Sequence, residues 1–136
     1  MGETSALLAA GGAQVESVEV DPRAVVEATR RGPGQGVRRQ AGRAEDLAPT
    51  LPPADVVVTN PPRTGMDARV VNAIVAARPR RVAYISCDPA TLARDLSRLL
   101  PRVPTSPPWR LAALRAFDLF PQTAHVETVA IVESDR

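Results

Sequence analysis

The 136-residue chain contains no lysine, one cysteine and one histidine. A single cysteine cannot form an internal disulfide, and a reducing compartment would leave its thiol free. No run of about 18 apolar residues is present, which excludes an obvious membrane-spanning helix. The start, Met1–Thr4, lacks the charged and apolar regions of a signal peptide. These absences predict a soluble, cytoplasmic protein without a membrane segment.

All 17 basic residues are arginine, a bias that GC-rich genomes produce and that is therefore weak evidence for function. Against 15 acidic residues the net charge is only +2, and the isoelectric point is about 9.4. This balance permits weak affinity for polyanions but does not establish a nucleic-acid partner. The hydrophobic content of 44% is that of a globular protein, and the length predicts one domain.

Helical and strand-like segments alternate along the chain. In the first part, Gly11-Gly12 ends a helix over 5–10, a short strand follows, and Asp21-Pro22 opens the next helix. The β-branched run over 54–59 is typical of a strand buried on both faces in a parallel sheet. The remaining predicted elements are a strand over 37–40, a helix over 67–77, a buried strand over 81–86, a helix capped by Asp88-Pro89, a proline-rich loop over 101–108, and a hairpin of strands over 110–118 and 126–133.

This order predicts an α/β fold with a doubly wound, mostly parallel sheet and a closing antiparallel hairpin. Ligands of such folds bind beyond the carboxyl ends of the strands. Three polar residues follow predicted strands there, namely Glu19, Asn60 and Cys87. Glu19 suits the two hydroxyls of a nucleoside ribose, although a solvated acid at a strand end is an equally good interpretation.

Asn60-Pro61-Pro62-Arg63 predicts a rigid polar loop, since two prolines fix the backbone and leave carbonyl groups outside any strand pairing. Amino-group methyltransferases have an Asn-Pro-Pro-aromatic loop that stacks the target base. Here Arg63 stands in the aromatic position, where it would contact phosphate or a base edge. The alternative is a proline-rich turn with a surface arginine.

Cys87 lies between a predicted strand and the start of a helix, where unpaired N–H groups favour the thiolate and make it a candidate nucleophile. Asp88 opposes this effect unless its charge is used to cap the helix. The alternative is a buried cysteine that acts as a small hydrophobe.

His125 and Glu127 are two residues apart, so on a strand they point to one face, which an apolar core would not tolerate. That face is either solvent-exposed or a site. No second histidine is available for a metal cluster or a Ser/His/Asp arrangement, so no metal is expected.

Three motifs in order resemble the S-adenosylmethionine-dependent RNA uracil-5-methyltransferases, which make 5-methyluridine in transfer and ribosomal RNA. Asn60–Gly65 is similar to the family's Asp-Pro-Pro-Arg-x-Gly. Ser86–Leu96 (SCDPATLARDL) is similar to its nucleophile motif, and Phe117–Glu127 (FDLFPQTAHVE) to its C-terminal base motif. The resemblance extends from residue 2 to about residue 133.

The resemblance implies a Rossmann-like catalytic domain and a role for each candidate. Cys87 adds to C6 of a uracil, and Glu127 removes the C5 proton after methyl transfer. Gly2, Glu3, Glu19 and Asn60 bind S-adenosyl-L-methionine. Arg63 and His125 contact the substrate, a uridine of transfer RNA or 23S ribosomal RNA that must leave its stack to react. Departures from the family pattern are Asn60 for Asp, Asp88 for Asn, and Arg43 where an acid often faces the adenine.

The resemblance begins inside the cofactor loop, because Gly2 aligns with the second glycine of the family's Cys-Gly-x-Gly. We therefore expect residues 1–136 to be part of a catalytic domain without its first strand, the start of its cofactor loop and the RNA-binding domains. The hypotheses are a truncated gene product or a GTG valine codon read as initiator Met1. Two other functions stay open: an amino-group methyltransferase, and a non-catalytic remnant or interaction module.

Overall fold

The computed structural model describes residues 2–31, 36–100, 109–119, 122 and 126–134. The predicted loop over 101–108 lies outside these residues. The chain divides into two compact units, Met1–Leu51 and Pro52–Arg136, called here the N-terminal and the C-terminal unit. Each unit has its own sheet.

The N-terminal unit contains a parallel two-stranded sheet of β1 (Val15–Glu19) and β2 (Val37–Ala41). Its helices are α1 (Glu3–Ala10), α2 (Pro22–Arg30), α3 (Ala44–Leu47) and the 3-10 helix η1 (Ala48–Thr50). The Asp21 carboxylate accepts the Arg23 N–H at 2.9 Å, which confirms the predicted cap of α2. The sequence did not predict α3 or η1.

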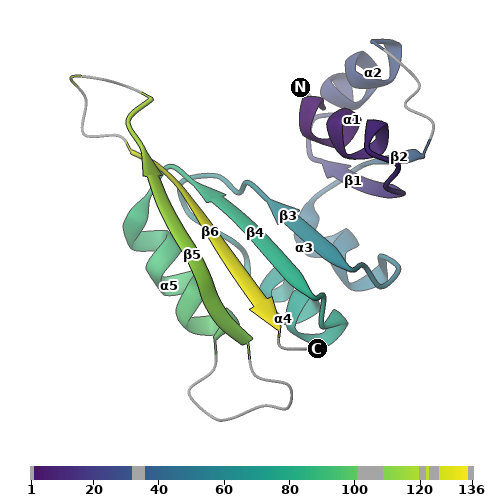
Figure 1. Ribbon diagram of the computed structural model, residues 1–136. Coiled ribbons are helices and arrows are strands. Elements are labelled where there is room, and N and C mark those ends of the chain that lie inside the picture. The colour runs from purple at the N-terminus through teal and green to yellow at the C-terminus, as the bar shows by residue number, and fades with distance from the viewer. Residues whose placement is uncertain (1, 32–35, 101–108, 120–121, 123–125, 135–136) are drawn as a thin grey trace. The chain divides into compact units, whose positions relative to one another are not determined.

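The C-terminal unit is a four-stranded sheet in the order β3-β4-β6-β5, shown in Figure 1. Strands β3 (Val56–Thr59) and β4 (Arg81–Ser86) are parallel, and β6 (Glu127–Ser134) runs antiparallel between β4 and β5 (Trp109–Phe117). Helices α4 (Ala68–Ala77) and α5 (Pro89–Leu99) cover one face of this sheet. The last two strands therefore form the predicted antiparallel pair.

The core of the C-terminal unit lies between the sheet and these two helices. Alternate residues of β4 and β6 are buried in it, as the pleat requires. The buried apolar residues are Met66, Val71, Ile74, Val82, Tyr84, Leu92, Leu99, Ala130 and Val132. The predicted leucine face of α5 is confirmed, since Leu92 and Leu99 are buried and Leu96 and Leu100 pack against the core.

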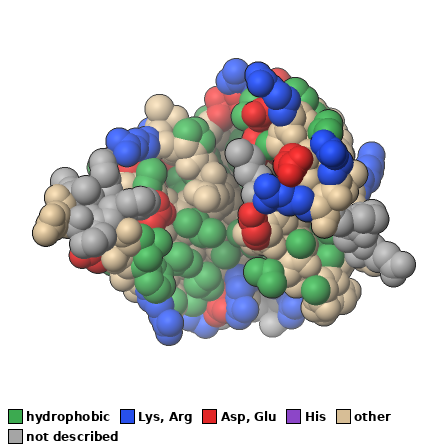
Figure 2. All heavy atoms as spheres, turned by 90° about the horizontal axis from the view of Figure 1, so that it is seen from above, with side chains coloured by type: hydrophobic (Ala, Val, Ile, Leu, Met, Phe, Trp, Pro, Cys, Tyr) green, Lys and Arg blue, Asp and Glu red, His purple; other side chains and the backbone are tan. Residues whose placement is uncertain are grey.

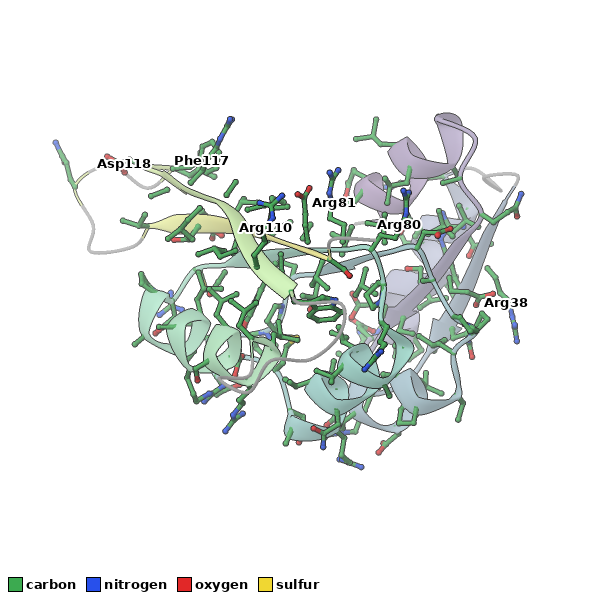
Figure 3. All side chains as sticks on the ribbon, turned by 60° about the horizontal axis from the view of Figure 1, so that its bottom comes forward. Arg38, Arg80, Arg81, Arg110, Phe117 and Asp118 are labelled. Carbon is green, nitrogen blue, oxygen red and sulfur yellow. The ribbon has the colours of Figure 1, made fainter. Side chains whose placement is uncertain are left out.

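The opposite face of this sheet is less covered, and one prediction is wrong there. Strand β3 is not buried on both faces, because Val56 and Val58 are 45% and 38% exposed. Figure 2 shows hydrophobic side chains at the surface beside arginines. On this face Glu133 pairs with Arg81 and, at 3.3 Å, with Arg110, and Figure 3 shows both arginines pointing away from α4 and α5.

Strands and helices alternate along both units, as the predicted α/β fold requires. Among the described residues, β1 pairs only with β2, and β3 has only β4 as a neighbour. In the described part of the chain, no helix is long and apolar enough to cross a membrane.

Candidate active site

Three described candidates of the C-terminal unit lie at one edge of its sheet. Asn60 follows β3 and Cys87 follows β4, and the carboxyl ends of parallel neighbours lie at the same edge. Strand β6 begins at this edge with Glu127. Since Ser86 pairs with Thr128, the next residues in the same antiparallel register are Cys87 and Glu127. The topology therefore brings together two candidates 40 positions apart in the chain.

A tight turn holds Cys87 between Ser86 and Asp88. The Ser86 hydroxyl accepts the Asp88 N–H at 3.1 Å and donates to the Asp88 carbonyl oxygen at 3.0 Å. Ser86 is buried and Cys87 is partly exposed. The residues before and after Cys87 are therefore hydrogen-bonded to each other, and solvent can reach the thiol between them.

Asp88 caps α5, as the sequence predicts. Its carboxylate accepts the Thr91 N–H at 2.9 Å. This hydrogen bond lowers the pKa of Asp88, and the nearby Arg63 guanidinium contributes to the same effect. The negative charge beside Cys87 is thus engaged by the helix terminus and by the cation of the Asn60–Gly65 loop.

The loop after β3 is folded back onto α5. Its Gly65 N–H donates to the Pro62 carbonyl oxygen at 2.8 Å, closing a turn around Arg63 and Thr64. Gly65 has a φ of 78°, in the region that favours glycine. Asn60 and Arg63 are both exposed. The rigid loop expected from the two prolines is therefore also held by a turn.

Glu127 lies on the sheet face away from the core. Thr128, the next residue, is buried, and Glu127 pairs across the sheet with Phe117 of β5. This agrees with the expectation that an acid here would not face an apolar core. His125 lies outside the described residues, so its predicted role stays a prediction.

The other candidates belong to the N-terminal unit. Gly2 precedes α1 with a φ of 83°, and a Cβ there would lie 2.8 Å from the Ala28 Cβ. Glu3 begins α1, and its carboxylate lies 3.9 Å from an Arg31 guanidinium nitrogen. Glu19 ends β1, where its Oε1 atom accepts the Asp21 N–H at 3.1 Å.

Arg43, which departs from the family pattern, is paired within its own segment. Its Nε atom donates to Glu45 Oε1 at 2.6 Å. The positive charge of Arg43 is therefore balanced by a neighbouring carboxylate. Among the described residues, no group of three or more His, Cys, Asp or Glu side chains could hold a metal ion.

Sequence reasoning missed three polar residues around the site. Ser86 fixes the Cys87 turn, and Tyr84 and Asp95 are buried and hydrogen-bonded to each other at 2.8 Å. Asp95 carried a signal that could have found it, since it lies three residues after Leu92 and four before Leu99, on the apolar face of α5.

Solved structures with the same arrangement of elements are class I methyltransferases. The tRNA (uracil-54, C5)-methyltransferase of Pyrococcus abyssi, in complex with S-adenosyl-L-homocysteine, superposes with a TM-score of 0.76 at 27% identity, over 96% of this chain and 31% of that chain. An rRNA methylase of Streptococcus thermophilus shares the fold alone, with a TM-score of 0.69 at 14% identity, over 98% of this chain and 80% of that chain. The fold is thus that of the class I S-adenosylmethionine-dependent methyltransferases.

The family follows from the sequence comparison. Residues 36–135 match the tRNA (uracil-5-)-methyltransferase family, and the chain belongs to it. An uncharacterized RNA methyltransferase of Gloeobacter violaceus is 43% identical over 98% of this chain, and one of Thermosynechococcus vestitus is 39% identical over 97%. The chain spans only 28% and 29% of the length of these two curated relatives.

Proposed function

We propose that this chain is part of the catalytic domain of an enzyme that methylates C5 of a uridine in transfer or ribosomal RNA. The observation that carries the proposal is the β4–β6 register, in which Cys87 and Glu127 are the next pair after Ser86 and Thr128. A nucleophile and a base at one sheet edge suit a reaction that first adds to a ring and later removes a proton from it.

The first step assigned to this chain is nucleophilic addition. The Cys87 thiolate forms a bond to C6 of the uracil, and the C5–C6 π electrons move toward the O4 carbonyl. C5 thereby becomes nucleophilic. S-adenosyl-L-methionine, when bound, supplies an electrophilic methyl group to which C5 bonds as the sulfur–methyl bond breaks.

The second step restores the ring. Glu127 accepts the C5 proton, the electron pair of that C–H bond re-forms the C5–C6 double bond, and the C6–sulfur bond breaks to release the thiolate. The position of Glu127 on the sheet face away from the core supports this role, because a base must reach a substrate that enters from solvent.

Residues of each unit fit the cofactor separately. In the N-terminal unit, the N-cap residue of α1 is Gly2, whose lack of a side chain leaves room for the cofactor carboxylate near the first-turn N–H groups. Glu3 lies in that first turn, and Glu19 at the end of β1 suits the ribose hydroxyls. In the C-terminal unit, exposed Asn60 offers an amide for a polar group of cofactor or base.

Arg63 and His125 are the proposed substrate contacts. Arg63 is exposed on a loop held by a turn, and an arginine there can bind an RNA phosphate or a base edge. The target uridine has to leave its stack before the Cys87 thiol can reach C6.

Mass spectrometry of the product nucleoside tests the proposal. The full chain is incubated with S-adenosyl-L-methionine and unmodified transfer or 23S ribosomal RNA, and 5-methyluridine is the expected product. Glu127→Gln should accumulate a methylated protein–RNA adduct, because the C5 proton has no acceptor. The variant Glu133→Gln, further along β6, is the matched control and should turn over normally.

The other functions make different predictions. Methylation of an exocyclic amino group, with no dependence on Cys87, would favour the amino-group methyltransferase. Absence of any calorimetric signal with S-adenosyl-L-methionine or S-adenosyl-L-homocysteine would favour a non-catalytic remnant for this chain.

A further inference from the structure

One charged side chain is completely buried among the described residues, and the chemistry above does not use it. Asp95 has no exposed surface. Its Oδ1 atom accepts the Arg94 guanidinium at 2.8 and 2.9 Å, and an Arg98 nitrogen lies 3.6 Å away. A buried carboxylate is costly unless hydrogen bonds satisfy it, so its partners show what it holds.

The second oxygen of Asp95 joins two other parts of the unit. Oδ2 accepts the Tyr84 hydroxyl of β4 at 2.8 Å and the Met66 N–H at 2.7 Å. Met66 is the residue after the Asn60–Gly65 loop. One carboxylate of α5 therefore ties together the strand before Cys87, the helix after it and the loop that carries Arg63.

Arg94 adds a second link from the same helix to the same loop. While bound to Asp95, its Nη2 atom also donates to the Thr64 carbonyl oxygen at 2.8 Å. Between these two links lies Gly65, where a Cβ would come within 2.5 Å of Asp95 Oδ2. The loop thus approaches α5 more closely than any side chain at position 65 would allow.

We propose that Asp95 is a positioning residue that fixes the Asn60–Gly65 loop against α5 and so holds Arg63 beside the Cys87 turn. The effect on catalysis rests on the proposed function, but the attachment of the loop to α5 can be measured independently of any activity. Tyr84 and Arg94 support the same carboxylate, one from the core and one from the surface.

Amide hydrogen exchange of the full, ¹⁵N-labelled chain tests the attachment. In Asp95→Asn the Met66 amide should exchange at least about tenfold faster relative to the amides of β4, because its charged acceptor is replaced by a neutral one. Leu99→Val is the matched control. It removes a buried methylene from the same helix face and should speed exchange across the core without singling out Met66.

A second variant keeps the test decisive if Asp95→Asn does not fold. Arg94 is 42% exposed, so Arg94→Met keeps the side-chain stem and removes the bond to Thr64. We expect the Gly65 and Met66 amides to lose protection while the β4 amides keep theirs. Unchanged protection of both amides would overturn the inference.

Kinetics separate a positioning role from a merely structural one. Asp95→Asn should lower the single-turnover rate of methyl transfer by about ten- to a hundredfold at saturating RNA, whereas Leu99→Val should not. A loosened loop with an unchanged rate would overturn the positioning role. If the unmodified chain neither methylates RNA nor binds cofactor, the proposed function fails, and the exchange data still decide whether Asp95 holds the loop.

Discussion

The hydroxyl oxygen of Ser86 lies 3.1 Å from the backbone nitrogen of Asp88 and 3.0 Å from its carbonyl oxygen, so one buried side chain closes the turn that presents Cys87. The turn connects the end of β4 to the first residues of α5. Both hydrogen bonds come from the Ser86 hydroxyl, so a substitution at Ser86 removes them and leaves the Cys87 side chain unchanged.

Ser86→Ala should destabilise the chain by about 1–3 kcal/mol, because the Asp88 N–H loses its acceptor in a part-buried position. Urea denaturation followed by circular dichroism measures this change. Ser97→Ala is the control, since the Ser97 hydroxyl donates to the Arg94 carbonyl oxygen at 2.6 Å on the exposed surface of α5. Equal small effects of the two substitutions would show that the turn does not depend on Ser86.

Asp88 predicts a pH dependence of stability. The Thr91 N–H holds the pKa of Asp88 below its usual value, so the carboxylate stabilises the fold above the unfolded pKa of about 4 and loses this effect as the pH falls through the lowered folded value. Asp88→Asn keeps a capping oxygen that does not titrate. Unfolding free energies of the two proteins should therefore diverge at acid pH, with the wild-type chain losing more. Parallel curves would contradict this.

Gly65→Ala and Gly12→Ala form a matched pair of substitutions. Both glycines have positive φ, at 78° and 90°, but a Cβ at position 12 meets nothing within 4 Å, whereas one at position 65 overlaps Asp95. We expect about 1–2 kcal/mol of destabilisation at Gly12 from the backbone alone, and about 2–5 kcal/mol at Gly65. Thermal unfolding of both variants measures the difference. Equal losses of stability in the two variants would mean that Gly65 does not pack closely against Asp95 of α5.

Glu19→Gln should weaken S-adenosyl-L-homocysteine binding by about 10- to 100-fold, because a charged acceptor of the ribose hydroxyls is lost. Isothermal titration calorimetry measures it. Glu16→Gln on the same strand is the control, since Glu16 pairs with Arg38 and Gln40 of β2. Unchanged affinity in Glu19→Gln would remove Glu19 from the proposed cofactor site.

Local patterns in the sequence predicted most of the elements. Asp21 and Asp88 each precede a proline and each cap a helix, because both the capping oxygen and the proline ring suit a first turn. The error at β3 has a physical reason. A β-branched run shows that a strand is compatible with burial, but whether it is buried depends on other segments that pack on it. Among the described residues, no segment packs closely enough on Val56 and Val58 to bury them.

Local patterns could not predict which residues, distant in the sequence, become neighbours at the site. The hairpin of β5 and β6 was predicted, but not that β6 inserts between β4 and β5, and this insertion makes Cys87 and Glu127 neighbours in register. Asp95 was missed for a related reason. Its partners Met66 and Tyr84 are 29 and 11 positions away, and only the packed structure brings them to one carboxylate.

The most direct test of the central claim uses RNA that contains 5-fluorouridine. In this nucleoside a fluorine atom replaces the C5 hydrogen, so a base cannot remove a proton from C5 after methyl transfer. Incubated with this RNA and S-adenosyl-L-methionine, the chain should form a covalent adduct that survives denaturing electrophoresis. The adduct should be absent in Cys87→Ala. An adduct that persists in Cys87→Ala would contradict the assignment of Cys87 as the nucleophile.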